Sequence, residues 1–222
     1  MIEKKFEIVS LGVNCLPRTV LTRHGIKPRK ADGELSCPFD LVSHRLDRII
    51  YYLNNNFADY FDDFSFKLRK RNFLDFRGKG IWVKEDETQF FHDKDCKIND
   101  KEKLISRIKN RINNFNTIIQ NDRPILFVLN IVNNDGDIEE LYNTLKRLRQ
   151  GKKFKLAIFD FGQITEFWSK YNDDIYILRL PKPIDRYYTL WNTSKFRNTN
   201  LGKYFEHCIC EFINEIIKKD FS

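Results

Sequence analysis

The sequence predicts an α/β fold with a largely parallel sheet flanked by helices. Continuous apolar runs at 125–129, 154–159 and 175–178 are typical of strands that are covered on both faces. Segments with helical spacing lie between or beside these runs, which favours parallel strands joined by crossover helices. A strand at 6–11 followed by a helix at 16–24 repeats the same unit at the start of the chain.

Each element of the first half follows from apolar spacing and turn residues. Gly12 and Asn14 are turn formers that separate the first strand from the first helix. Residues 25–40 form an irregular link, and helical spacing resumes at 43–53. Residues 55–100 interrupt the alternation and are predicted to be an insertion. Within it, 81–83 and 89–91 are expected to pair as a hairpin.

The second half holds the clearest periodic segments. A helix over 104–119 stops at Asp122-Arg-Pro124, because proline cannot continue a helix. Further helices are predicted at 137–149, 164–171 and 201–216. The chain shows no internal repeat and no low-complexity linker, so we expect a single α/β domain over residues 1–222.

Composition narrows the class of protein. Apolar residues make up 41% of the 222 residues, which argues against extensive disorder. No stretch approaches the roughly 18 apolar residues that a membrane span needs, and no signal-peptide core follows Met1. The five cysteines are odd in number and irregularly spaced, which fits a reducing compartment. A cytoplasmic protein without a membrane span, a metal site or a cofactor motif is the expectation.

The net charge of +8 does not by itself indicate nucleic acid. The 39 basic residues are spread along the chain among 31 acidic ones. The densest basic run, Lys67-Leu-Arg-Lys-Arg71, has aromatic neighbours, which is also how a nucleic-acid surface is composed. A solvated face with inward aromatics is the simpler interpretation, so the sequence argues against nucleic acid as a partner.

Cys15 is the most informative residue. It stands where the first strand turns into a helix, and a helix N-terminus offers free backbone N–H groups and a partial positive charge. Both favour the nucleophilic thiolate, and the N–H groups around Gly12, Asn14 and Leu16 could hold an oxyanion or a phosphate. The alternative is a buried, space-filling thiol, as expected of Cys37.

Other polar residues also stand where predicted strands end. Asn130 and Asn133 follow the second strand, and Asp160 follows the third. Because sites of parallel sheets gather outside the carboxyl ends of the strands, these residues are expected near Cys15.

A nucleophilic thiol needs a base, and the chain has four histidines. His24 and His207 are expected on the surface, and His44 could follow Asp40 into a site. His92 closes a predicted strand and precedes Asp93, which makes it the favoured base. An ordinary surface histidine is the alternative for His92.

Two carboxylates could orient the imidazole. Asp93 adjoins His92, but neighbouring residues of a strand point to opposite faces, so the chain must turn between them. Asp40 is the second candidate, and its alternative role is a helix cap before 43–53.

Three motifs resemble a bacterial and viral family of unknown function that is labelled papain-like cysteine peptidases. They are Ser10-Leu-Gly-Val-Asn-Cys15, Ser36-Cys-Pro-Phe-Asp40 with Ser43, and Phe91-His-Asp93. The likeness covers most of residues 6–160. It implies roles for Cys15, Asp40, His92 and Asp93, although Leu41 stands where the family usually has tryptophan. A papain-like fold is not a parallel sheet, and here the strand–helix alternation decides the expected fold.

The residues leave three functions open. The first is a cysteine-dependent hydrolase or acyl transferase acting on a small molecule, a peptide or a glycan. The second is a transferase that binds a sugar or nucleotide-linked donor at the Gly12–Cys15 turn, where a helix N-terminus would hold phosphate. The third is a non-enzymatic binding protein. The sequence does not identify the substrate or the oligomeric state.

Overall fold

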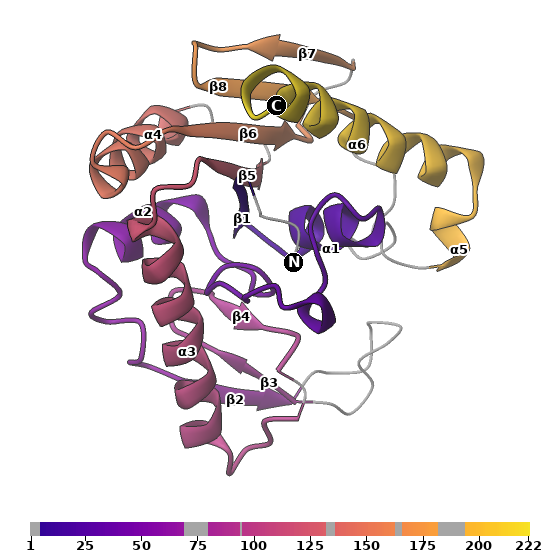
Figure 1. Cartoon of the computed structure of the whole chain (residues 1–222). Coiled ribbons are helices and arrows are strands. Elements are labelled where there is room, and N and C mark those ends of the chain that lie inside the picture. Colours follow the sequence, from indigo (N-terminus) through magenta and orange to yellow (C-terminus); the bar gives the residue numbers. More distant parts are fainter. Residues whose placement is uncertain (1–4, 69–79, 94, 132–135, 163–165, 182–193) are drawn as a thin grey trace.

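The computed structural model describes residues 5–68, 80–93, 95–131, 136–162, 166–181 and 194–222. Most of the basic run after Lys67 lies outside these residues, and so does Asn133. The described chain is a mixed α/β protein with a five-stranded, mainly parallel sheet, as the sequence predicts (Figure 1).

The large sheet has the strand order β1-β5-β6-β8-β7. Its parallel strands are β1 (Glu7–Gly12), β5 (Ile125–Ile131), β6 (Phe154–Asp160) and β8 (Ile175–Arg179). β1 lies beside β5, with Val9 opposite Phe127. All seven residues of β5 are buried, which confirms that it is covered on both faces.

One predicted helix is a strand. The spacing of apolar residues over 164–171 indicates a helix, but β7 (Phe167–Lys170) runs antiparallel to β8 at the sheet edge. The turn between them explains the difference, because the Asn172 side chain accepts hydrogen bonds from the N–H groups of Asp174 and Ile175. Eight residues are too few to separate the two periods when such a turn closes a hairpin.

Helices cover both faces of the sheet. Figure 1 shows α1 (Leu16–Arg23) and α6 (Asn200–Asp220) on one side of the strands. On the other side lie α2 (Leu46–Asn54), α3 (Lys101–Gln120) and α4 (Gly136–Arg149). Successive strand residues alternate between the two cores, since Ile8 packs with the α1–α6 side and Val9 with the other.

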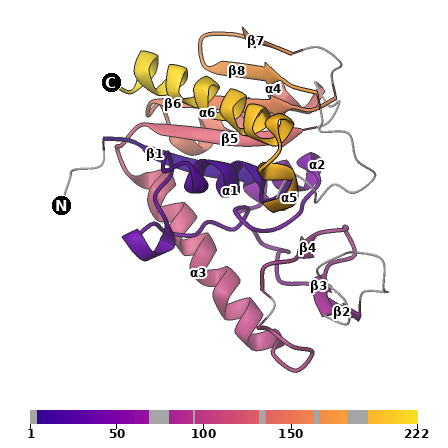
Figure 2. The ribbon, with the colours of Figure 1, turned by 90° about the vertical axis from the view of Figure 1, so that its right-hand side faces the viewer.

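The predicted insertion forms a second, smaller sheet. β2 (Ser65–Leu68), β3 (Gly80–Val83) and β4 (Gln89–Phe90) are antiparallel neighbours, which confirms the hairpin. Trp82 and Phe90 belong to the same apolar cluster as β1 and β5, so the two sheets share a core. In Figure 2 this small sheet lies below the large one, beside α3.

The remaining elements are short. They are the 3-10 turn η1 (Lys30–Asp32) and the helix α5 (Ser194–Arg197), which packs on α6. No helix in the described part of the chain combines the length and the apolar character needed to cross a bilayer.

Candidate functional site

The turn between β1 and α1 is built around glycine. Gly12 ends β1 with φ of +92°, a left-handed conformation that side chains with a Cβ rarely adopt. The chain then reverses through Asn14 and enters α1, for which Cys15 is the N-cap residue. The backbone of this turn therefore places Cys15 at the carboxyl end of a parallel strand, as the sequence predicts.

The N–H groups at the start of α1 are largely committed. The Leu16 N–H donates to Asn14 Oδ1 at 2.8 Å, and Pro17 has no N–H to offer. The side chain of Asn14, two residues before α1, thus occupies the Leu16 N–H, which is not left open to an anion. A phosphate site on these groups gains no support from this geometry.

Burial has a larger effect on the pKa of the Cys15 thiol than the groups at the start of α1 have. Burial raises the pKa of Cys15 above its ordinary value, while the Thr19 hydroxyl and the backbone N–H of Cys15 lower it less strongly. This direction is opposite to the sequence expectation. The reason is that desolvation penalises the thiolate more than the local donors stabilise it.

Thr19→Val should make Cys15 a poorer thiolate. Thr19 lies one turn after Cys15 on α1, and its hydroxyl lowers the thiol pKa. Valine keeps the shape but removes this donor, so the pH midpoint of Cys15 alkylation by iodoacetamide should move to higher pH. Mass spectrometry of the Cys15 peptide across a pH series measures the shift, with Thr22→Val as the matched control on the same helix. An unchanged midpoint in Thr19→Val would contradict the hydrogen bond.

Asp40 is tied to the helix that carries Cys15. Its carboxylate forms a buried ion pair with Arg18 and accepts the Cys37 N–H at 2.7 Å. Asp40 does not cap the following helix, because α2 begins at Leu46 with Arg45 as its N-cap. The helix-cap alternative is therefore wrong, and Asp40 joins the second motif to the first turn of α1.

Backbone hydrogen bonds bring the three motifs together. The His44 N–H donates to the Val13 carbonyl at 2.9 Å, which attaches the second motif to the turn before Cys15. The next residue back, Ser43, exchanges two backbone hydrogen bonds of 2.9 Å with Gln89 at the start of β4. β4 leads directly to His92. The motifs that lie far apart in the sequence are thus neighbours in space.

His92 and Asp93 differ in exposure. His92 is exposed in the turn after β4, whereas Asp93 is buried. The Asp93 carboxylate receives hydrogen bonds from Arg107 at 2.8 Å and from Arg111 at 2.8 and 3.0 Å, both from α3. Asp93 therefore anchors the His92 turn to α3 and is engaged by guanidinium groups.

The other histidines have separate surroundings. His44 is buried, and its Nε2 lies 2.7 Å from the Tyr60 hydroxyl, within a cluster of aromatic rings. His24 lies at the far end of α1, 2.7 Å from Glu206, and His207 is exposed on α6. The prediction that His24 and His207 are surface residues is confirmed. His44, which the sequence allowed to follow Asp40 into a site, lies in the interior against these rings.

His44 should make stability depend on pH in the acid range. Burial lowers the pKa of His44 to about 3, against 6.5 for an ordinary histidine. The unfolded chain therefore binds the extra proton first, and this contribution is complete above about pH 6.5 and is lost as the pH falls towards 3. In His44→Leu the free energy of unfolding should fall less steeply between pH 7 and pH 4, as measured by urea titration. A slope equal to that of the unsubstituted protein would contradict the buried neutral imidazole.

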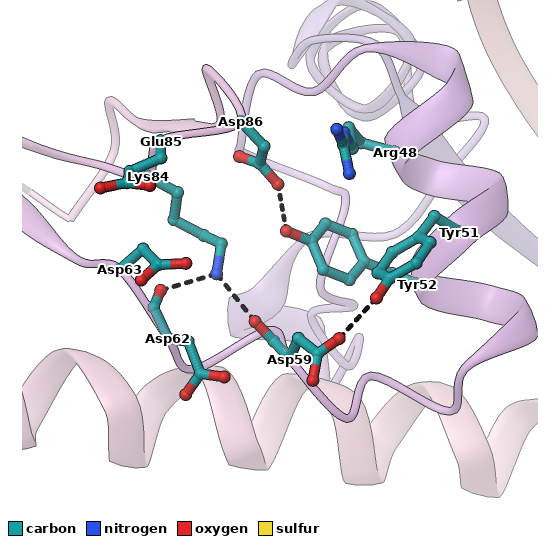
Figure 3. A pocket seen from close by; sticks show the side chains of 9 residues that line it. All are labelled: Arg48, Tyr51, Tyr52, Asp59, Asp62, Asp63, Lys84, Glu85 and Asp86. Atoms are coloured by element: carbon teal, nitrogen blue, oxygen red, sulfur yellow. Dashed lines mark hydrogen bonds between the residues drawn. The ribbon is translucent and has the colours of Figure 1, made fainter.

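A cavity of the described chain lies away from these residues. It has a volume of about 440 Å³, and none of the predicted site residues lines it (Figure 3). Its lining is mainly acidic: Arg48, Tyr51, Tyr52, Asp59, Asp62, Asp63, Lys84, Glu85 and Asp86. The ammonium of Lys84 donates to the carbonyls of Asp59, Tyr60 and Asp62, at 2.9, 3.2 and 2.7 Å. Lys84 thus binds the preceding loop.

Sequence reasoning missed the partners of the motif residues. Thr19 was detectable, since a residue four positions after Cys15 shares its helix face. Arg111 was detectable as well, because it interrupts the apolar stripe of α3 between Ile108 and Phe115. Nothing in the sequence around Arg18 indicates its partner, since only the fold brings Asp40 next to it. Among the residues that the structure describes, no group of three His, Cys, Asp or Glu side chains is arranged to hold a metal ion.

Comparison with known proteins adds one finding. Residues 6–165 match the sequence profile of a family described as "Putative papain-like cysteine peptidase". This span contains all three motifs and more than half of the chain. No curated protein and no solved structure matches the sequence.

Proposed function

The chain belongs to the family so described, and from that premise we propose that it is a cysteine-dependent hydrolase or acyl transferase with Cys15 as its nucleophile. The proposed substrate is a peptide or another acyl compound that presents a carbonyl group to the thiol. His92 is the proposed base.

The accessibility of Cys15 carries this proposal. Three cysteines lie within the matched residues 6–165, and two of them, Cys37 and Cys96, are only 1% and 2% exposed. Cys15 is partly exposed and lies at the carboxyl end of a parallel strand, where sites in such sheets gather. A nucleophile must reach its substrate, and of these three cysteines Cys15 is the residue with the largest exposure.

Comparing the surroundings of the histidines within residues 6–165 favours His92 as the base. The His44 imidazole is enclosed by aromatic rings, and His24 pairs with Glu206 at the opposite end of α1 from Cys15. His92 is exposed and follows β4, which the Ser43–Gln89 pairing connects to the Cys15 turn. Because the pKa of Cys15 is raised, a base that removes the thiol proton during attack is required.

The proposed chemistry has two steps. His92 accepts the thiol proton while the Cys15 sulfur bonds to the substrate carbonyl carbon, and the backbone N–H of Cys15 stabilises the oxyanion. The leaving group takes a proton from the His92 imidazolium and departs, which leaves a thioester. Water or another acceptor nucleophile then attacks the thioester, with His92 as base, and releases the acyl group.

The two carboxylates are assigned a positioning function. Asp40 holds Arg18 and with it the first turn of α1, while Asp93 holds the His92 turn against α3 through Arg107 and Arg111. Each carboxylate acts through the backbone of its segment. Their guanidinium partners neutralise them, which distinguishes them from a carboxylate that hydrogen-bonds an imidazole.

An acyl-transfer assay with p-nitrophenyl acetate tests the proposed pair. We expect a burst of p-nitrophenol and an acetyl group on Cys15, detected by mass spectrometry. His92→Ala should slow acetylation by about 10²-fold or more, because a general base contributes about that much, and should remove the corresponding limb of the pH profile. His207→Ala, which changes an exposed histidine on α6, is the control and should react normally.

Two results would count against the proposal. Acetylation of other cysteines without acetylation of Cys15 would reject Cys15 as the nucleophile. Acetylation of Cys15 that is equally fast in His92→Ala would leave the nucleophile in place but reject His92 as the base.

A further inference from the structure

A second described cavity lies at the end of α1 that is remote from Cys15. It has a volume of about 360 Å³, is open to solvent, and lies between α1, α5 and α6. Its lining is mostly cationic or titratable: Arg23, His24, Arg197, Asn198, Lys203, Glu206, His207 and Cys210. At 1.5 Å per residue, the eight-residue helix α1 separates its floor from the Cys15 turn by about 12 Å. The two places are therefore distinct.

One carboxylate faces several cations in this cavity. Glu206 is buried and engaged on both oxygens, by Arg23 on one side and by His24 at 2.7 Å on the other. Arg197 and Lys203 form no ion pair with any residue that the structure describes. Counting the histidines as neutral, Arg23, Arg197 and Lys203 outweigh Glu206, so the lining carries a net charge of +2.

The two arginines also repel each other. The pKa of Arg23 is lowered, first by burial and then by the nearby charge of Arg197, while Glu206 acts in the opposite direction. The Nε atom of Arg197 is buried without a hydrogen-bond partner among the described residues. A buried N–H without an acceptor is unfavourable, and so are two adjacent guanidinium groups. A bound anion in the cavity would relieve the repulsion between the two guanidinium groups.

Close helix packing holds Arg197 in this position. Gly202 of α6 lies so near α5 that a Cβ atom there would meet the Phe196 carbonyl oxygen at 2.2 Å and the Arg197 Cα at 2.9 Å. Only glycine permits this approach. The backbone of α5 is therefore seated directly on α6, and Arg197 is presented to the cavity by a packed contact between two helices.

We propose that this cavity binds the phosphate group of a small phosphorylated molecule. Arginine supplies planar, paired donors that fit phosphate oxygens, and Lys203 adds a point charge at the rim. The volume falls within the range of small-molecule pockets. Glu206 holds Arg23 and His24 through its two carboxylate oxygens, and both residues line the same cavity as Arg197.

Calorimetric titration with pyrophosphate tests the site. We expect saturable binding at fixed ionic strength, with one pyrophosphate per chain. Arg197→Gln and Lys203→Gln should each weaken binding about tenfold or more, since each removes a charge-assisted hydrogen bond. Lys218→Gln, which removes an exposed charge from the last turn of the same helix, is the matched control and should leave the affinity unchanged. Circular dichroism confirms that each variant is folded.

Three outcomes would overturn the proposal. They are the absence of saturable binding, an equal loss of affinity in Lys218→Gln, and RNA binding that is tighter than pyrophosphate and is lost in the same variants. The last result would assign the cavity to nucleic acid. Cys15 acetylation should proceed normally in Arg197→Gln, so a failure of the proposed enzymatic function and a failure of this site are separate results.

Discussion

Cys15→Ser is expected to reduce acetylation by p-nitrophenyl acetate at least about 10³-fold, the largest effect on activity that the structure indicates. A serine hydroxyl at the same position is a much weaker nucleophile than a thiol at neutral pH. The side chains are similar in size, and Cys15 is only partly buried, so the fold should be retained. The measurement is the burst of p-nitrophenol together with the mass of the Cys15 peptide.

Cys208→Ser is the matched control for this prediction. Cys208 is the other partly exposed cysteine, and it lies outside residues 6–165. Burial and a hydrogen bond to Glu166 raise its pKa to about 11, so it is a poor nucleophile at neutral pH. This variant should keep the full burst. A burst that survives in Cys15→Ser but disappears in Cys208→Ser would reverse the assignment.

Asp40→Asn is expected to cost about 3–5 kcal/mol in the free energy of unfolding. The Arg18 and Asp40 side chains are 8% and 2% exposed, so removing the negative charge leaves a guanidinium buried without its counter-charge. The same change weakens the acceptor for the Cys37 N–H. Urea unfolding at pH 7 measures the loss. Because α1 carries Cys15 on its first turn, acetylation should also slow in the fraction that remains folded.

A double substitution and an exposed pair provide the controls. Arg18→Met combined with Asp40→Leu replaces two buried charges by apolar groups and should recover much of the stability, but not the position of α1. Arg45→Gln breaks a pair whose members are 63% and 46% exposed, and should change stability by less than about 1 kcal/mol. If Asp40→Asn were as mild as Arg45→Gln, the buried pair would not support α1.

The fold class could be predicted because it depends on local pattern. Continuous apolar runs at β5, β6 and β8 identify strands that are covered on both faces, and the spacing of α3 and α6 identifies amphipathic helices. The hairpin of β3 and β4 was likewise predicted. β7 was not, since the turn at Asn172 outweighs an eight-residue apolar pattern.

In the candidate site, too, local features could be predicted from the sequence, whereas features that depend on the fold could not. The position of Cys15 at a strand–helix junction follows from the order of residues alone, because Gly12 ends the strand and α1 begins directly after Cys15. The direction of the shift in the Cys15 pKa could not be predicted from the sequence, since desolvation depends on how much of the chain surrounds the thiol. The arginine partners of Asp40 and Asp93 are 14 to 22 residues away in the sequence.

The sequence by itself thus determined the α/β architecture, the junction that presents Cys15 and the family motifs, because each of these depends on residues close to one another in the chain. Only the tertiary structure decided which charges meet. It paired Arg18 with Asp40 and Arg111 with Asp93, and it placed Arg197 against Arg23 across the second cavity. Electrostatic interactions depend on distance in space and on burial, and neither quantity is set by neighbours in the sequence.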